Sequence, residues 1–300
     1  MIGSPWAALS PCTAACVTGE PPRSRAARAL TARRYAAFVS TLAGAAAAGG
    51  RLQEGEELRR RARALLADLG VSLLGGTDGL AVPEPVTGVG TLVVANHISW
   101  LDALALLAVQ PATLLAKREV ARWPLVGPLV RRAGTRFIDR TGLRGLPETV
   151  RELGALLRSG ETVIVFPEGT TWCSAPGGVF RRATFQAALD AGAPVRPVTL
   201  TYASQGVPST LPAYVGEGTF TASFRRVAAA RGLSVLVTAH PALRPEGHDR
   251  RSLAALAQEA VSGGRQGVAV PAPRRPSPTT ARPGHHPAAG RPPHLPVRAP

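Results

Sequence analysis

The sequence predicts an α/β fold: a mixed, largely parallel sheet flanked by helices, with N-terminal helices before it and a disordered C-terminal tail after it. From about residue 85, short apolar runs alternate with longer segments of helical periodicity, the pattern of strands joined by crossover helices. Apolar residues make up 45% of the 300-residue chain, which is enough for a large core. Beyond Gly263 the composition becomes simple and rich in proline and arginine.

The part of the chain before the predicted sheet divides into an arm and a helical region. Residues 1–30 show no sustained periodicity and lack the order of a signal peptide, so we expect a flexible N-terminal arm without export. Residues 31–84 are interpreted as a helical, membrane-associating region. Its alanine-rich run, Tyr35 to Gly50, is shorter than the ~20 residues that span a bilayer. We expect this helix to lie on the membrane or pack on the domain, and a spanning helix is the less favoured alternative.

A second, basic helix is expected within the same region. Its leucines recur at helical spacing beside a run of arginines, and the residues concerned are Leu52, Leu58, Leu65, Leu66, Leu69, Arg59, Arg60, Arg61 and Arg63. A basic amphipathic helix suits an anionic membrane surface, the interpretation that we favour. The alternative is a helix that packs its leucines on the core and keeps a solvated basic face.

Residues 85–262 are the predicted α/β domain. Strands are expected at 91–95, 113–116, 135–138, 162–166, 197–202, near 220–225 and at 234–239. Helices are expected at 102–109, 120–132, 146–158, 180–191 and 249–262. Sites in such sheets gather beyond the carboxyl ends of strands, so the polar residues that follow strands are the candidate site residues.

The C-terminal segment, residues 263–300, is expected to be a disordered tail. Between Pro271 and Pro300 there are ten prolines and five arginines but no acidic residue. Such a composition buries too little apolar surface to order itself.

Charge and cysteine content restrict the partners and the compartment. The net charge of +16 implies anionic partners such as lipid headgroups, phosphorylated substrates or nucleic acid. No nucleic-acid motif is recognised, and aromatic residues make up only 5% of the chain. Cys12, Cys16 and Cys173 show neither metal-ligand spacing nor an even count, so we expect no zinc site and no disulfide framework, consistent with a reducing compartment.

Lys117 is unusual because every other basic residue among the 35 is arginine. Where arginine is used throughout, a single ammonium is either a compositional survivor or a group needed for its compact point charge.

The stretch Asn96-His97-Ile98-Ser99-Trp100-Leu101-Asp102 follows the apolar run 91–95. His97 and Asp102 meet only if His97 lies in the strand-to-helix turn and Asp102 in the first helical turn. The carboxylate then accepts the imidazole N–H and leaves the other nitrogen as a base. The alternative is a strand-end histidine with an unrelated aspartate.

Three further stretches follow in order. They are Gly134-Thr135-Arg136-Phe137-Ile138-Asp139-Arg140, Phe166-Pro167-Glu168-Gly169-Thr170 and Pro194-Val195-Arg196-Pro197-Val198. With the His97 stretch they resemble the four ordered motifs of the glycerolipid (lysophospholipid) acyltransferase family, especially the 1-acyl-sn-glycerol-3-phosphate acyltransferases. The resemblance covers roughly residues 88–245 and implies that residues 85–262 are a catalytic domain.

The resemblance implies roles for individual residues. It places Arg140, Glu168 and Gly169 in acceptor binding, and Lys117 lies in another stretch that recurs in the family. Arginine and backbone N–H groups suit a phosphate, so Arg140, Gly169 and Thr170 are the predicted phosphate contacts. Lys117 would bind phosphate or a pantetheine-linked donor.

Glu168 has three possible roles. Its carboxylate bonds a glycerol hydroxyl, fixes a basic residue, or complements a helix dipole.

The predicted function is O-acyl transfer from acyl-CoA or acyl-carrier protein to a lysophospholipid, converting 1-acyl-sn-glycerol-3-phosphate to phosphatidate. His97 is the general base and Asp102 orients it, with no metal and no cofactor beyond the acyl co-substrate. The alternatives are another lysolipid acceptor, such as a lyso-aminolipid, and a non-enzymatic basic lipid- or nucleic-acid-binding protein. The expected location is peripheral, at an anionic surface on the cytoplasmic face of the cell membrane.

Overall fold

The computed structural model describes residues 8–18, 24–83, 88–122, 126–138, 145–174, 176–216 and 218–266. Within these ranges the strands are β1 Val71–Gly75, β2 Leu92–Ala95, β3 Thr113–Lys117, β4 Arg136–Ile138, β5 Val163–Val165, β6 Val195–Ser204, β7 Val207–Pro208 and β8 Leu233–Ala239. The α-helices are α1 Arg25–Ala48, α2 Gly55–Asp68, α3 Leu101–Val109, α4 Val126–Arg132, α5 Leu146–Arg158, α6 Ala183–Ala191, α7 Phe220–Ala229 and α8 Arg250–Gln266. Short 3₁₀ helices cover Ala14–Cys16, Gly49–Gln53 and Arg118–Arg122.

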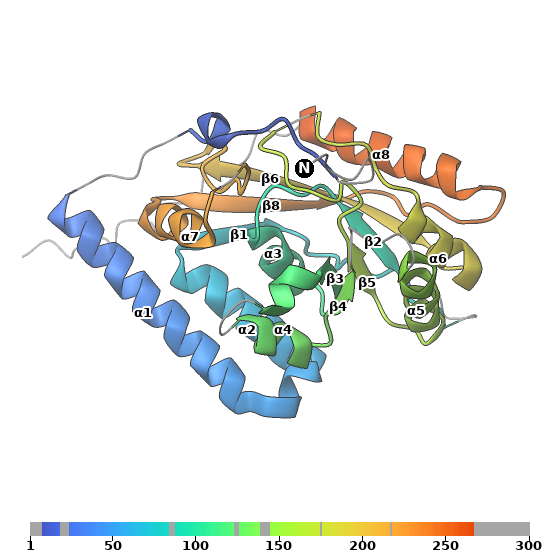
Figure 1. Cartoon of the computed structure of the whole chain (residues 1–300), viewed down its shortest axis with the longest axis horizontal. Coiled ribbons are helices and arrows are strands. Elements are labelled where there is room, and N and C mark those ends of the chain that lie inside the picture. Colours follow the sequence, from blue (N-terminus) through green and yellow to red (C-terminus); the bar gives the residue numbers. More distant parts are fainter. Residues whose placement is uncertain are drawn as a thin grey trace, which may run out of the picture.

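The strands form one mixed sheet in the order β1-β8-β6-β2-β5-β3-β4, with β7 paired to the end of β6 (Figure 1). The pairs β6–β8 and β6–β7 are antiparallel, and the other pairs are parallel. The predicted α/β class with a largely parallel sheet is therefore confirmed. Strand β2, which leads into the His97 stretch, lies in the middle of the sheet between β5 and β6.

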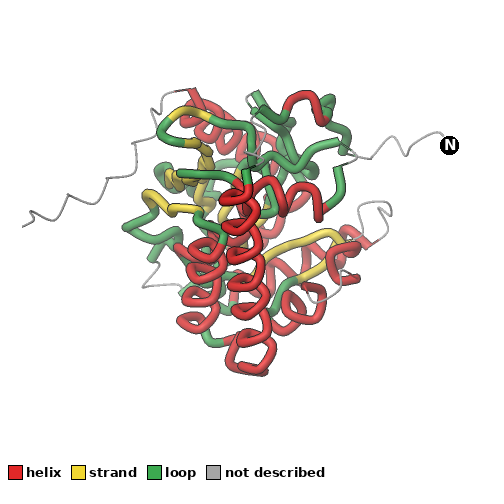
Figure 2. The backbone as a smooth tube through the Cα atoms, turned by 90° about the vertical axis from the view of Figure 1, so that its left-hand side faces the viewer, coloured by secondary structure: helices red, strands yellow, loops and turns green. Residues whose placement is uncertain are grey.

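Helices cover both faces of the sheet, and β2 contributes to both layers. Val93 and Ala95 face a core shared with α1, α2, α3 and α7. Leu92 and Val94 face a second core shared with α5, α6 and α8. Figure 1 shows these two helix groups on opposite sides of the strands, and Figure 2 shows α1 extended along the outside of the first group. A strand buried on both faces is a near-continuous apolar run, which is why the sequence shows no alternation here.

Helix α1 begins earlier than predicted and packs through aromatic contacts. Ser24 caps it by accepting a hydrogen bond from Ala27 N at 3.1 Å. Phe38 on its inner face meets Phe224 of α7 edge-on, with ring centroids 5.0 Å apart. The leucine face of α2 packs into the core through Leu65, Leu66 and neighbouring residues, as in the second of the two alternatives for this helix.

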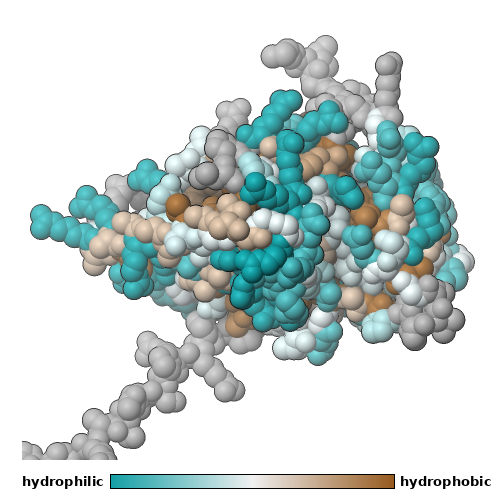
Figure 3. Space-filling model, turned by 90° about the horizontal axis from the view of Figure 1, so that it is seen from below, coloured by the Kyte–Doolittle hydropathy of each residue, from teal (hydrophilic) through white to brown (hydrophobic). Residues whose placement is uncertain are grey.

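The surface of this helical region is mixed. None of the helices in the described ranges combines the length and the apolar character needed to cross a membrane. Seen from below in Figure 3, the molecule shows brown apolar patches interrupted by teal hydrophilic ones. Membrane association remains a prediction.

Three sequence predictions differ from the structure. The strand expected near 220–225 is wrong, because those residues lie in α7. The Thr219 side chain caps that helix by accepting from Ala222 N at 3.2 Å, and Phe220, Phe224 and Val227 recur at helical rather than alternating spacing. The single helix expected at 120–132 is a 3₁₀ turn followed by α4, with residues 123–125 outside the described ranges.

The third difference is β1, an edge strand that the sequence analysis missed. Its residues do not alternate clearly between buried and exposed, so it carries no period-2 signal. The predicted boundaries of the arm, the helical region, the catalytic domain and the tail remain predictions, and residues 267–300 lie outside the described part of the chain.

Candidate active site

His97 lies in the turn that joins β2 to α3, and Asp102 lies in the first turn of α3. His97 Nδ1 is 2.8 Å from Asp102 Oδ2, so the structure brings the two side chains together. The end of β2 is fixed by Asn96, whose amide nitrogen donates to Leu200 O at 3.0 Å and whose carbonyl accepts from Leu200 N at 2.7 Å. Asn96, the residue before His97, therefore anchors the turn to the neighbouring strand β6.

Asp102 is fully buried and accepts four hydrogen bonds. Besides His97, the donors to Oδ2 are Ile98 N at 2.6 Å and Ser99 N at 2.8 Å. Tyr202 OH donates to Oδ1 at 2.6 Å. Burial, and the Asp102 carboxylate beside it, raise the pKa of Tyr202 well above its usual value, so the phenol stays a donor. The carboxylate is thus held in one orientation by the turn and by strand β6.

The contacts of the His97 ring favour one tautomer and fix the ring plane. With the Nδ1 proton directed at Asp102, Nε2 carries the lone pair that can accept a proton. The ring stacks on Phe166, with centroids 4.2 Å apart and planes 17° from parallel. Its side chain is 19% exposed, whereas that of Asp102 is 0% exposed. The group that can exchange a proton faces outward, and the group that orients it is enclosed.

Glu168 supports the backbone of His97. Its Oε2 accepts from His97 N at 2.7 Å, and its Oε1 accepts from Arg265 Nη2 at 2.7 Å and Gly178 N at 3.3 Å. Burial raises the pKa of Glu168, while Arg265 and the His97 N–H act in the opposite direction. Of the three roles considered for Glu168, the structure shows the pairing with a basic residue.

Sequence reasoning missed Arg265. It lies in the last turn of α8, three residues beyond the predicted end of that helix, and nothing near it in the sequence distinguishes it from the many other arginines.

The loop after Glu168 approaches other parts of the chain closely. Gly169 has a φ of +75°, and a Cβ atom there would lie 2.9 Å from Ala8 Cβ and 3.0 Å from Arg181 Nε. Both the backbone conformation and the space therefore favour glycine at this position. Thr170 lines the same cavity as His97.

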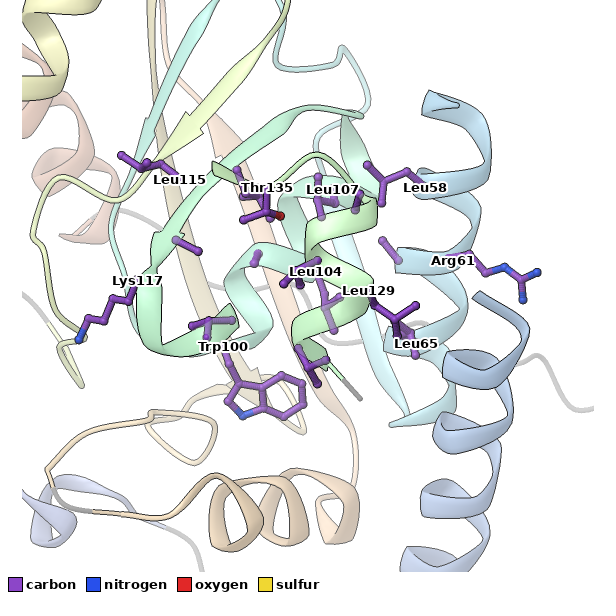
Figure 4. Close-up of a pocket in the computed structure, with 18 of the residues that line it drawn as sticks. Leu58, Arg61, Leu65, Trp100, Leu104, Leu107, Leu115, Lys117, Leu129 and Thr135 are labelled. Carbon is purple, nitrogen blue, oxygen red and sulfur yellow. The ribbon is translucent and has the colours of Figure 1, made fainter. Parts of the chain in front are cut away.

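Lys117 is the last residue of β3 and lines the same cavity as His97. In Figure 4 its ammonium extends away from the leucines of the cavity. Asp139 and Arg140 lie outside the described residues, so the predicted acceptor contact of Arg140 remains a prediction.

A cavity of about 320 Å³ opens beside His97. Its walls are almost entirely apolar and come from α1, α2, α3, β3 and α4, as Figure 4 shows for Leu58, Leu65, Leu104, Leu107 and Leu129. Arg61 contributes its stem, while its guanidinium extends outward in the same view. An elongated apolar ligand with a reactive polar end suits this arrangement, because the polar side chain of His97 borders an otherwise largely apolar cavity.

Comparison with known proteins gives consistent matches. A family model described as Acyltransferase matches residues 81–201, which include His97, Asp102, Lys117 and Glu168. A 1-acyl-sn-glycerol-3-phosphate acyltransferase of Neisseria gonorrhoeae is 39% identical over 173 residues, covering 56% of this chain and 68% of the relative. A lyso-ornithine lipid O-acyltransferase of Pseudomonas aeruginosa is 36% identical over 180 residues, covering 60% of this chain and 69% of the relative.

A solved structure shares the fold. The crystal structure of the 1-acyl-sn-glycerophosphate (LPA) acyltransferase from Thermotoga maritima superposes with a TM-score of 0.60 at 21% identity. The match covers 80% of this chain and 95% of that one.

Proposed function

Because this chain belongs to the acyltransferase family, we propose that it transfers a fatty acyl group from a thioester to the free hydroxyl of 1-acyl-sn-glycerol-3-phosphate, giving phosphatidate. The observation that carries the proposal is the contact of His97 with Asp102, because His97 also lines an apolar cavity. A base beside an apolar cavity suits an acyl chain whose reactive carbonyl lies next to His97.

The residues of this chain suit direct transfer of the acyl group from the thioester to the acceptor hydroxyl. His97 Nε2 removes the proton of the acceptor hydroxyl while its oxygen attacks the thioester carbonyl. The Asp102 carboxylate stabilises the imidazolium that forms. Collapse of the tetrahedral intermediate breaks the carbon–sulfur bond, and the imidazolium returns the proton to the departing thiolate. The atoms balance without an acyl-enzyme, so no serine or cysteine nucleophile is required.

The acceptor phosphate would be bound by positive charge near the cavity. Lys117, Arg140 and the backbone N–H group of Thr170 are the proposed contacts, whereas Gly169 N already donates to Phe166 O at 3.1 Å. Glu168 acts through the backbone of His97 in this proposal, since its two oxygens are already engaged. The donor is acyl-CoA or acyl-carrier protein, and the enzyme would work at an anionic membrane surface on the cytoplasmic face.

A second acceptor class is a lyso-ornithine lipid, which the Pseudomonas aeruginosa relative is named for. The two acceptors differ in charge, because one carries a phosphate monoester and the other an amino acid headgroup. We favour the phosphate because the chain carries a net charge of +16.

An acceptor panel tests the proposal. Purified protein is given labelled acyl-CoA or acyl-carrier protein with 1-acyl-sn-glycerol-3-phosphate, other lysophospholipids or a lyso-ornithine lipid, and the products are identified by lipid mass spectrometry. Phosphatidate as the main product supports the proposal. If the acylated lyso-ornithine lipid were the main product, it would replace the proposed acceptor, and the proposed acyl transfer reaction would stand.

A further inference from the structure

All three cysteines of the chain lie together, although they come from distant parts of the sequence. Cys12 and Cys16 lie on the segment 8–18, and Cys173 lies in the loop that follows Glu168, 161 residues after Cys12. Their three Sγ atoms all lie within 4.8 Å of one another. The closest pair, Cys12 Sγ and Cys173 Sγ, is 3.3 Å apart. The spacing along the chain gave no metal signal because the third thiol is contributed by the fold.

We propose that Cys12, Cys16 and Cys173 bind one thiophilic metal ion of the zinc class, which joins the segment 8–18 to the loop beside His97. Two thiolates about 2.3 Å from one tetrahedral zinc ion lie roughly 3.8 Å apart, which falls between the 3.3 Å of the closest sulfur pair and the 4.8 Å within which all three sulfurs lie. A disulfide joins only two sulfurs and would leave the third without a function. Three mutually adjacent thiols therefore favour an ion over a covalent link.

Hydrogen bonds hold the backbone around the three thiols. Cys173 N donates to Cys12 Sγ at 3.4 Å, and Cys12 N donates to Ser10 Oγ at 3.2 Å. Cys16 ends a 3₁₀ turn, and its carbonyl accepts from Thr210 Oγ1 at 2.8 Å. All three cysteines are free, and Cys16 and Cys173 are partly exposed, so an ion can enter and a water molecule can complete the coordination. Each thiol that ligates the ion releases its proton to solvent.

The position of the cluster gives the ion a structural role. The residue before Cys173 is Trp172, whose backbone N–H donates to the backbone carbonyl of His97 at 2.8 Å. Thr18 N donates to Thr210 Oγ1 at 3.0 Å, so the segment 8–18 also contacts the loop near Tyr214. A bound ion would therefore fasten this segment across two loops that support the active site. The ion takes no part in the transfer reaction, and its binding can be measured whichever acceptor the enzyme uses.

Cobalt substitution tests the site. Full-length reduced protein without a histidine tag is titrated with Co²⁺, and a thiolate-to-metal charge-transfer band is expected to saturate at one equivalent and to disappear on adding Zn²⁺. Zinc should also raise the melting temperature. No band, or a band without a defined stoichiometry, would overturn the proposal.

Substitutions at Cys16 distinguish a three-thiol metal site from a disulfide. Cys16→Ser keeps the closest sulfur pair, so a disulfide would survive while zinc affinity should fall on the order of 10²-fold or more. Cys16→His should restore binding, because imidazole also ligates zinc. Ser10→Ala keeps all three sulfurs and should bind almost as the parent does. Wild-type affinity in Cys16→Ser, verified as folded by circular dichroism, would contradict the three-thiol site.

The double substitution His285→Ala and His286→Ala distinguishes the thiol cluster from the C-terminal tail, because it removes two imidazoles of the tail and no sulfur. Unchanged binding in that double variant is expected. Loss of the band there would assign the ion to the tail.

Discussion

Arg265 Nη2 lies 2.7 Å from Glu168 Oε1, and the two side chains are only 6% and 1% exposed. The other oxygen of Glu168 accepts from the backbone N–H of His97. The last turn of α8 is thereby connected, through one carboxylate, to the residue that would act as the base.

Arg265→Met should destabilise the protein, because it leaves the buried Glu168 carboxylate without its cation. Breaking a buried pair by removing one partner typically costs about 3–5 kcal/mol. Urea unfolding measures the change, and Arg250→Met, at the exposed start of the same helix, is the matched control. Equal stability of the Arg265 variant and the parent would show that the pair contributes little.

The cost of Arg265→Met should depend on pH. Arg265 lowers the pKa of Glu168, which burial raises, so its removal raises that pKa further. The difference in unfolding free energy between parent and variant then has its full value at pH values above the pKa of Glu168 in the variant. It diminishes as the pH falls towards the parent's Glu168 pKa, because a protonated carboxyl no longer needs the cation. Unfolding curves at several pH values above about 4.5 test this, and a difference independent of pH would contradict it.

His97→Ala should lower turnover by about 10²–10⁴-fold, the usual cost of losing a general base. The side chain is partly exposed, so folding should be nearly unaffected. Initial rates with labelled acyl-CoA give the effect, and the melting temperature serves as the control. Near-normal turnover would exclude His97 as the base.

Substitutions of Asp102 and Tyr202 should distinguish the effect of orienting the carboxylate from the effect of its charge. Asp102→Asn retains an acceptor for the imidazole but removes the charge that stabilises the imidazolium, so turnover should fall strongly. Tyr202→Phe keeps the charge and removes one donor, which should cost about 1–3 kcal/mol of stability with a smaller loss of turnover. Initial rates and urea unfolding of both variants give the two effects. Comparable turnover losses in the two variants would mean that the carboxylate charge has no special part.

Leu104→Trp should shift acyl-chain preference towards shorter chains, because Leu104 lines the apolar cavity and the larger ring occupies part of it. Each methylene that no longer fits forfeits about 0.8 kcal/mol of burial. Competition between acyl donors of different length, analysed by mass spectrometry, gives the preference. Leu156→Trp, on the opposite core, is the control, and an equal shift there would remove the cavity from donor or acceptor binding.

Lys117→Arg should lower activity at unchanged thermal stability if the compact ammonium is needed. A guanidinium displaces its donors by an ångström or more, and such misplacement can cost on the order of 10²-fold in a preorganised site. Arg151→Lys, an exposed exchange on α5, is the reverse control. Steady-state rates and melting temperatures of both variants are compared with the parent. Parent kinetics for both substrates would identify the single lysine as compositional.

The sequence was informative where local pattern and local chemistry coincide. Strand β2 and the start of α3 are a clear apolar run followed by a polar turn, which allows His97 and Asp102 to meet, and the resemblance of the other stretches to the acyltransferase motifs decided in favour of the pair. The resemblance to the acyltransferase motifs identified Glu168 as a candidate site residue, but it did not identify the partner Arg265. The contact between Glu168 and Arg265 depends on how α8 returns across the sheet, which no local pattern specifies.

The error at α7 has the same origin. The residues of α7 combine aromatic and β-branched side chains, which favour strands by propensity, while packing against Phe38 and a threonine cap stabilise a helix. The spacing of the cysteines along the chain predicts no zinc site, and that expectation stays a prediction, but the spacing could not show that the fold places Cys173 beside Cys12. In both places the sequence lacks information on long-range proximity.

The residues that hold the turn between β2 and α3 through hydrogen bonds are synthesised much later than the turn itself. Asn96 pairs with a residue 104 positions onward, Asp102 with one 100 positions onward, and Glu168 with one 97 positions onward. Contacts of such sequence separation close late, because the chain between them must first lose its freedom. On the ribosome, the nascent chain would carry the His97 and Asp102 side chains while β6 and α8 are still missing. Acyl transfer should therefore begin only after translation has passed α8, so that an incomplete chain stays inactive.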